Sequence, residues 1–162
     1  MITRERLHTV LRPEPGERVL EIGVGTGYYS LDLAAWIGPA GRLELFDLQQ
    51  EFLDHVMAAA AGRGVANLHP TRGDATALPY EDASVDAVVL TAVLGEIPDS
   101  DAALREVGRV LKPDGRLVVG ELFGDPHFTT RAALEERGRA AGLRLEERSG
   151  SWFGYFARLV PA

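Results

Sequence analysis

The chain has 162 residues, 46% hydrophobic and 25% charged, so residues 1–162 are expected to fold as one soluble domain with a proper core. Its net charge of −7 argues against nucleic acid as the main partner, because contacts to phosphates need a basic face. It contains no cysteine, which excludes disulfides and thiolate chemistry and favours a cytoplasmic location.

The sequence also argues against a membrane-spanning protein, a secreted protein and a metal-binding protein. No apolar run approaches the length of a membrane span, and the charged start of the chain lacks the apolar core of a secretory signal. The four histidines lie far apart without metal-ligand spacing, so we expect no metal site.

A short amphipathic helix is predicted over residues 1–12, and the prolines of residues 13–16 end it. The apolar run 19–22 then predicts a buried strand, and a helical pattern begins at about Tyr28. Three glycines at alternate positions separate the strand from the helix: Gly23, Gly25 and Gly27. Such a turn lets backbone N–H groups approach a nucleotide-like ligand closely.

The spacing of this turn narrows the choice of ligand. It is G-x-G-x-G, whereas a dinucleotide fingerprint is G-x-G-x-x-G, and an acid, Glu21, stands two positions before the first glycine. Both differences count against a phosphate cradle. A tight strand-to-helix turn without any ligand is the alternative.

A second strand is predicted over residues 42–47, and it ends in Asp47, 24 positions after Gly23. An acid about 20 residues beyond such a turn can accept hydrogen bonds from ribose hydroxyls. An exposed helix N-cap is the alternative, because residues 49–61 have the apolar spacing of a helix. A third strand over residues 68–71 precedes Asp74, which could instead simply form a turn.

Two further strands are predicted over residues 84–90 and 116–122, on either side of a helix and a turn at residues 112–115. Their near-continuous apolar runs are typical of parallel strands buried on both faces. The segments 91–98 and 120–128 leave the carboxyl edge of the sheet, where ligands bind in open α/β folds. They carry four polar residues that could meet a substrate or, alternatively, be solvated: Glu96, Glu121, Asp125 and His127.

The last predicted elements are a helix over residues 129–141 and a hairpin. The strands 143–148 and 152–159 are expected to pair across a turn at residues 149–151. Four aromatic residues of the hairpin are interpreted first as core and edge packing, and second as a wall for an acceptor: Trp152, Phe153, Tyr155 and Phe156.

The pattern Glu21-x-Gly23-x-Gly25-x-Gly27 resembles the first motif of class I S-adenosylmethionine-dependent methyltransferases. The run LREVGRVLKPDGRLVV is similar to a later block of that family, and the resemblance covers roughly residues 17–160. It implies an α/β fold: a Rossmann-like three-layer αβα sandwich around a seven-stranded, mainly parallel sheet with an antiparallel C-terminal strand. It also implies in-line methyl transfer from S-adenosylmethionine, with S-adenosylhomocysteine as product.

The resemblance assigns cofactor binding to ten residues: Glu21, Gly23, Gly25, Gly27, Tyr28, Asp47, Leu48, Asp74, Ala75 and Val93. The resemblance also implies that Asp74 accepts a hydrogen bond from the adenine amino group and that the Ala75 N–H lies near the adenine ring. A general base is needed only if the acceptor must lose a proton, and His127, Glu96 or Glu121 could then serve as catalytic residue.

The segments around Glu96 and His127 resemble those of quinone and other small-molecule methyltransferases (methyltransferase type 11), which implies a small-molecule acceptor. Many family members carry a longer N-terminal section over the cofactor. With no large lid here, either the site is more open or another subunit covers it, and a homodimer is compatible with this.

Two rival functions stay open. An NAD-dependent dehydrogenase shares the acid after the second strand, but Tyr28 and Tyr29 stand where its glycine fingerprint would continue. A protein that binds S-adenosylmethionine without transferring its methyl group, or a subunit of a complex, would suit the short N-terminal section.

Overall fold

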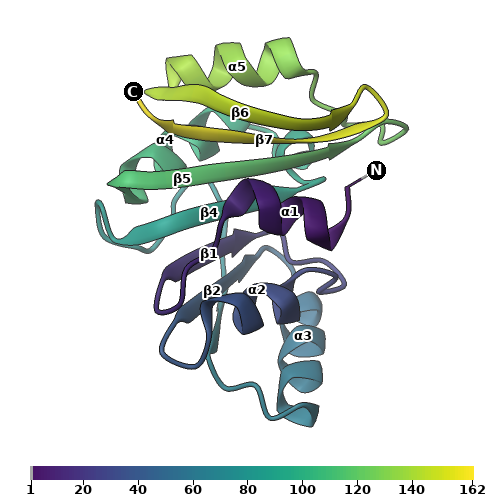
Figure 1. Ribbon diagram of the computed structural model, residues 1–162, viewed down its shortest axis with the longest axis vertical. Helices are drawn as coiled ribbons and strands as arrows, with labels where there is room; N and C mark the ends of the chain where they lie inside the picture. The colour runs from purple at the N-terminus through teal and green to yellow at the C-terminus, as the bar shows by residue number, and fades with distance from the viewer. Residues whose placement is uncertain (1) are drawn as a thin grey trace.

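A seven-stranded sheet runs through the molecule in the order β3-β2-β1-β4-β5-β7-β6 (Figure 1). The computed structural model describes residues 2–162, and its strands are β1 (Arg18–Ile22), β2 (Arg42–Asp47), β3 (Leu68–Arg72), β4 (Val85–Thr91), β5 (Leu111–Leu122), β6 (Leu143–Ser151) and β7 (Gly154–Pro161). Strands β1 to β5 pair in parallel, and β7 is antiparallel to both β5 and β6. The predicted sheet is therefore confirmed.

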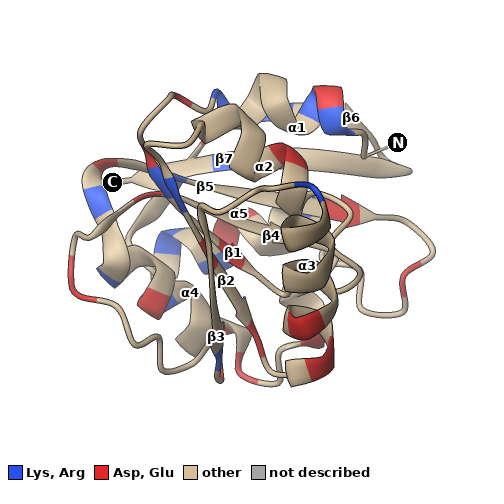
Figure 2. Cartoon of the chain, turned by 90° about the horizontal axis from the view of Figure 1, so that it is seen from below, with Lys and Arg blue, Asp and Glu red and all other residues tan. Residues whose placement is uncertain are grey.

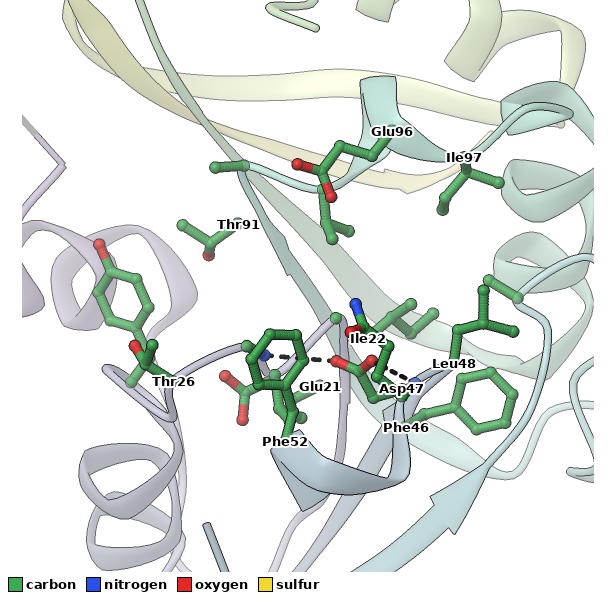
Figure 3. Close-up of a pocket in the computed structure, with 18 of the residues that line it drawn as sticks. Glu21, Ile22, Thr26, Phe46, Asp47, Leu48, Phe52, Thr91, Glu96 and Ile97 are labelled. Atoms are coloured by element: carbon green, nitrogen blue, oxygen red, sulfur yellow. Dashed lines mark hydrogen bonds between the residues drawn. The ribbon is translucent and has the colours of Figure 1, made fainter. Parts of the chain in front are cut away.

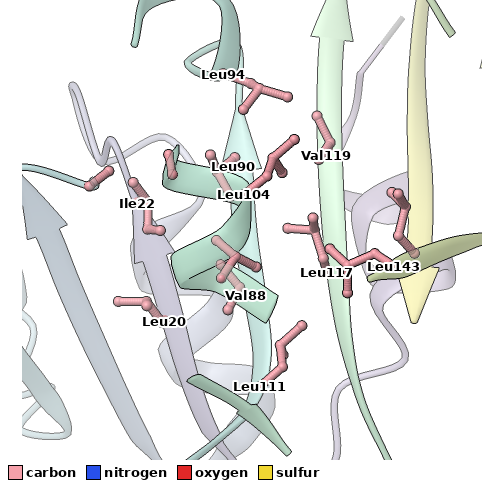
Figure 4. Packing of buried hydrophobic residues seen from close by; sticks show 14 of the residues in the cluster. Leu20, Ile22, Val88, Leu90, Leu94, Leu104, Leu111, Leu117, Val119 and Leu143 are labelled. Atoms are coloured by element: carbon pink, nitrogen blue, oxygen red, sulfur yellow. The ribbon is translucent and has the colours of Figure 1, made fainter. Parts of the chain in front are cut away.

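Helices cover both faces of the sheet. They are α1 (Arg4–Leu11), α2 (Ser30–Ile37), α3 (Gln50–Gly62), α4 (Ser100–Val110) and α5 (Arg131–Ala140), with a short 3₁₀ helix, η1 (Leu94–Glu96). Alternate strand residues point to opposite faces, so Leu20 and Ile22 belong to a buried cluster that includes Leu104 of α4 (Figure 4) and extends to α5. Their neighbour Val19 packs on the other face with α1, α2 and α3. The three-layer sandwich is thus confirmed.

The first helix is fixed to the sheet by a buried guanidinium. Arg116 of β5 donates hydrogen bonds to the carbonyl oxygens of Leu11 at 2.6 Å and Arg12 at 3.0 Å. It also donates two bonds of 2.7 Å to the Glu17 carboxylate and one of 3.4 Å to the Asp86 carbonyl. The side chain of Thr3 caps the start of α1 by accepting from the Arg6 N–H.

Some predicted boundaries are wrong. The helix expected from Tyr28 begins at Ser30, because the glycine turn extends through Tyr29. The turn at residues 112–115 is a bulge within β5, since Leu111 pairs with Val85 and Arg116 pairs with Ala87.

The hairpin turn is also misplaced by the sequence prediction. Ser151 still pairs with Gly154, so the turn consists of Trp152 and Phe153 rather than residues 149–151. Gly150 has a φ of +119° within β6, a conformation that favours glycine, so this glycine belongs to the strand and not to the turn. Tyr155 and Phe156 are buried as predicted, whereas Trp152 and Phe153 are 61% and 55% exposed.

Charged residues are distributed over helices, strands and loops. Seen from below the view of Figure 1, the blue positions are spread over several elements and are interspersed with red ones (Figure 2). Within residues 2–162, no helix is both long enough and apolar enough to cross a membrane.

Candidate functional site

A cavity of about 600 Å³ opens at the carboxyl ends of β1, β2 and β4 (Figure 3). The strand order reverses between β1 and β4, and ligands of open α/β sheets bind outside such a switch point. The volume lies in the range of small-molecule and cofactor sites, roughly 300–1,000 Å³. Its walls come from the glycine turn, the end of β2, residues 73–75 and residues 91–98.

The three glycines of the turn have different surroundings, although each has a positive φ. A Cβ on Gly23 would collide with the Val93 side chain, and a Cβ on Gly25 would meet no atom within 4 Å. Gly25 therefore leaves open space in which a ligand can approach the backbone. Gly27 does not line the cavity, because it lies against α3, where a Cβ would be 2.6 Å from Val56 Cγ2.

Asp47 joins the glycine turn to the loop after β2. Its Oδ2 accepts a hydrogen bond from the Gly25 N–H at 3.3 Å, and its Oδ1 accepts from the Gln49 N–H at 2.9 Å (Figure 3). The side chain is buried and lines the cavity. The N-cap of α3 is Gln49, so Asp47 is not the exposed helix cap that the alternative required.

Glu21 places a carboxyl group with an unmet hydrogen-bonding oxygen in the cavity wall. It is 5% exposed, and Oε2 has no partner. Burial raises the pKa of Glu21 to about 8, and the nearby carboxylate of Asp47 adds to the increase. Thr91 Oγ1 in the same cavity is also buried without a partner. Buried polar atoms without partners are costly, and a polar ligand in the cavity that bonded these two atoms would offset that cost.

The wall opposite the glycine turn combines one acid with apolar side chains. Asp74 is exposed, and its Oδ1 accepts from the Thr76 N–H at 2.9 Å and the Thr76 hydroxyl at 2.8 Å. These bonds lower the pKa of Asp74. Asp74 therefore forms the turn of the alternative interpretation, and it also lines the cavity beside Ala75 and Leu48.

The segment after β4 supplies the last wall. The side chain of Glu96 extends from η1 toward the cavity, which Thr91 and Ile97 also line (Figure 3). Ala92 has a φ of +54°, an unfavourable conformation for a residue with a Cβ, and its N–H donates to the Gly120 carbonyl. Backbone strain of this kind is concentrated at functional sites.

The other two predicted bases do not line the cavity. Glu121 is buried beneath the segment before α5, where Oε2 accepts from the Thr129 N–H at 3.2 Å and Oε1 has no partner. Burial raises the pKa of Glu121 to about 7. His127 is exposed, and its backbone N–H donates to Asp125 Oδ1. Of the three candidates, the structure brings only Glu96 to the cavity.

Sequence reasoning missed several lining residues. Ile2 contributes from the start of the chain, because the Tyr29 hydroxyl donates to its carbonyl at 3.1 Å. Phe52 contributes from the first turn of α3, a position that the strand-acid-helix order after Asp47 could have suggested. No sequence pattern indicated that Ile2 would line the cavity. In the described part of the chain, no three His, Cys, Asp or Glu side chains gather as a metal site.

Residues 19–115 match the methyltransferase domain family. The chain is 34% identical over 119 residues to the demethylmenaquinone methyltransferase of Lactobacillus johnsonii, a match that covers 73% of this chain and 49% of that protein. It is 39% identical over 113 residues to the ubiquinone/menaquinone biosynthesis C-methyltransferase UbiE of Cellvibrio japonicus, covering 69% of this chain and 45% of that protein. The chain thus spans about half the length of these curated relatives.

The fold has solved counterparts. A SAM-dependent methyltransferase from Aquifex aeolicus has a TM-score of 0.85 to this chain at 22% identity, over 97% of this chain and 89% of that one. At this identity the likeness shows a shared fold.

Proposed function

The chain belongs to the methyltransferase domain family, and we propose on that basis that it transfers a methyl group from S-adenosylmethionine to a small-molecule acceptor. The observation that carries the proposal is the cavity at the carboxyl edge of the sheet. It combines open backbone at Gly25, the fixed carboxylate of Asp47 and the unmet oxygens of Glu21 and Thr91. We also propose that residues 1–162 act as one cofactor-binding domain.

The residues present fit this cofactor. Bound S-adenosylmethionine supplies a methyl group already activated by its cationic sulfur, so alignment is the main task left to the protein. We assign the ribose hydroxyls to Asp47, whose oxygens each keep a free lone pair, and the ammonium group to Glu21. Asp74 and Ala75 would bind the edge of adenine, with Oδ2 of Asp74 outside the Thr76 turn.

Of the four other predicted cofactor contacts, three line the cavity and one does not. Tyr28, Leu48 and Val93 line the cavity, and we keep them as proposed cofactor contacts, with Leu48 as an apolar cover for adenine. Gly27 is proposed as a packing residue instead, because a Cβ there would point at Val56 and the residue does not line the cavity.

Glu96 is the proposed acceptor-facing residue. It is the one candidate base in the cavity wall, so its carboxylate can orient an acceptor or take a proton from it. His127 and Glu121 stay predictions that would require segment 124–129 to move, because Glu121 is covered by Thr129.

The acceptor class is proposed from charge and relatives. A net charge of −7 and scattered basic residues (Figure 2) favour a small molecule over nucleic acid. The relatives are named as quinone methyltransferases, which favours a quinone-like acceptor. Because the chain spans about half of their length, the proposal is limited to the general class of acceptor. A cytoplasmic location and a homodimer are kept as predictions.

Calorimetric titration with S-adenosylhomocysteine tests cofactor binding. We expect Asp47→Ala to weaken binding at least tenfold, whereas Glu96→Gln, the matched carboxyl control in the same cavity, should bind as the parent does. Equal binding by Asp47→Ala and the parent would contradict the assignment.

Two further assays separate the rival functions. In a thermal-shift comparison, S-adenosylmethionine should raise the melting temperature and NAD should not. Incubation with a labelled methyl donor and a cell extract should transfer label to an extractable small molecule. A protein that binds the donor and transfers no label would be a binder alone.

A further inference from the structure

A group of exposed apolar side chains lies outside the cavity and is unexplained by the fold. We call it the aromatic tip; it consists of Leu122, Phe123, Trp152 and Phe153, which are 41%, 52%, 61% and 55% exposed. The rings contact one another, with centroid distances of 3.7 Å between Trp152 and Phe153 and 5.2 Å between Trp152 and Phe123. Large apolar side chains gathered on a surface mark an interaction site.

The aromatic tip lies on the same edge of the sheet as the cavity. Strand β5 ends at Leu122 and runs parallel to β4, whose last residue, Thr91, lines the cavity. Because β7 is antiparallel to β5, the β6–β7 turn lies at this edge too (Figure 1). Two strand spacings separate β4 from β7, which is about 10 Å along the edge. A partner that contacts the tip would therefore approach the side where the cavity opens.

Two arginines lie near the aromatic tip although the chain is acidic overall. Arg131 Nη2 donates to the Gly150 carbonyl at 3.3 Å, just before the turn. Arg148 of β6 is exposed and lies four positions before Trp152 in the chain, and Asp125 is an acid on the adjoining loop. The guanidinium groups of Arg131 and Arg148 would complement an anionic surface.

We propose that the aromatic tip inserts into the interfacial region of a phospholipid bilayer, with these arginines facing the lipid phosphates. Trp and Phe are typical of side chains that bind at this depth, and basic residues add attraction to anionic lipids. Docking in this way would bring the cavity to an acceptor dissolved in lipid, and only this last step rests on the proposed function.

The size of the tip argues against a second copy of the chain as its occupant. A large aromatic side chain buries about 150–250 Å², so four half-exposed apolar side chains offer roughly 400 Å². A stable interface needs about 800 Å² on each partner. An apolar area of this size is better suited to insertion into a fluid interface than to a stable protein contact.

Tryptophan fluorescence tests the proposal directly, because the chain has two tryptophans, Trp36 and Trp152. In Trp36→Phe, emission comes from Trp152 alone. We expect vesicles of equimolar phosphatidylcholine and phosphatidylglycerol to shift it to shorter wavelength, and brominated acyl chains to quench it. In the matched variant Trp152→Ser, emission from Trp36 on α2 should not change.

Co-sedimentation with the same vesicles gives the second measurement. Trp152→Ser combined with Phe153→Ser should lower the bound fraction at least tenfold, and Arg131→Gln should weaken binding at low salt. Circular dichroism checks that each variant is folded. No methyl donor is present, so the result is independent of transferase activity.

Either of two results would overturn the proposal. The first is unchanged Trp152 emission and no co-sedimentation of the folded parent. The second is a shift that grows with protein concentration without vesicles, together with a dimer in analytical ultracentrifugation, which would assign the tip to a second copy.

Discussion

Proton release on ligand binding should report the role of Glu21. Burial raises the pKa of this side chain to about 8, so near neutral pH the carboxyl group is mostly protonated in the free protein. A carboxylate that pairs with the ammonium group of S-adenosylhomocysteine must first lose this proton. Binding should therefore become stronger as the pH rises toward 8.

The magnitude follows from the pKa. With a value of about 8, roughly one molecule in a hundred carries the carboxylate at pH 6 and roughly one in eleven at pH 7. The affinity should rise about ninefold over this interval, and about 0.9 proton should leave per ligand bound at pH 7.

Calorimetry in two buffers of different ionisation enthalpy, phosphate and Tris, measures this proton directly at pH 7. The apparent binding enthalpies of the parent should differ between the buffers, and those of Glu21→Gln should agree. The variant keeps every other titrating group, so subtracting its pH dependence isolates Glu21. The reasoning is refuted if parent and variant show the same pH slope, or if the parent's enthalpy does not depend on the buffer.

Three further predictions concern stability. Glu21 binds its proton more tightly in the folded state than in the unfolded state, so the free energy of unfolding should fall as the pH rises from about 4.5 to 8, by about 5 kcal/mol in total. Denaturant titrations should find a flatter pH dependence in Glu21→Gln than in the parent. An equally steep dependence in the variant would disprove this. Gly27→Ala should lower the free energy of unfolding by about 1–3 kcal/mol, because its Cβ would press on Val56 at a positive φ; a fully stable variant would refute the packing role. Arg116→Ala should cost about 3–5 kcal/mol by leaving Glu17 partly buried without its partner, and a loss below 1 kcal/mol in urea unfolding would contradict this.

Sequence patterns predicted the individual strands and the acid at the end of β2, whereas the seven-stranded sheet was implied by the family resemblance. Apolar runs mark parallel strands, and the distance from the glycine turn places Asp47 at the neighbouring strand end. The glycine spacing predicted a turn correctly but not what each glycine faces. Gly27 packs on Val56, which lies on a helix about thirty residues further along the chain.

The candidate bases show the same limit. The sequence placed Glu121 and His127 at the carboxyl edge, and the structure has Glu121 next to the end of β5 and His127 on the segment that follows it. Strand alternation puts Glu121 on the face of Val119, which packs with α4 and α5. There the Thr129 N–H covers it. Only the path of the following loop decides whether an edge residue reaches the cavity.

The two edges of the sheet differ in how far their polar groups are satisfied. At the amino edge, Arg116 has four strong hydrogen bonds, and Asn67 donates to the carbonyls of Ala34 and Gly38. At the carboxyl edge, Glu21 and Thr91 keep unmet oxygens.

Exposed rings are found at the carboxyl edge as well, in the aromatic tip. Positive φ at residues with a Cβ does not separate the two edges, because Arg12 and Ala83 adopt it near the amino edge and Ala92 at the carboxyl edge. Local rules of folding are broken mainly where function compensates for their cost. Ligand binding would satisfy Glu21 and Thr91, and a bilayer would cover the tip. A cofactor site and a docking surface on one edge therefore account together for features that the fold alone leaves costly.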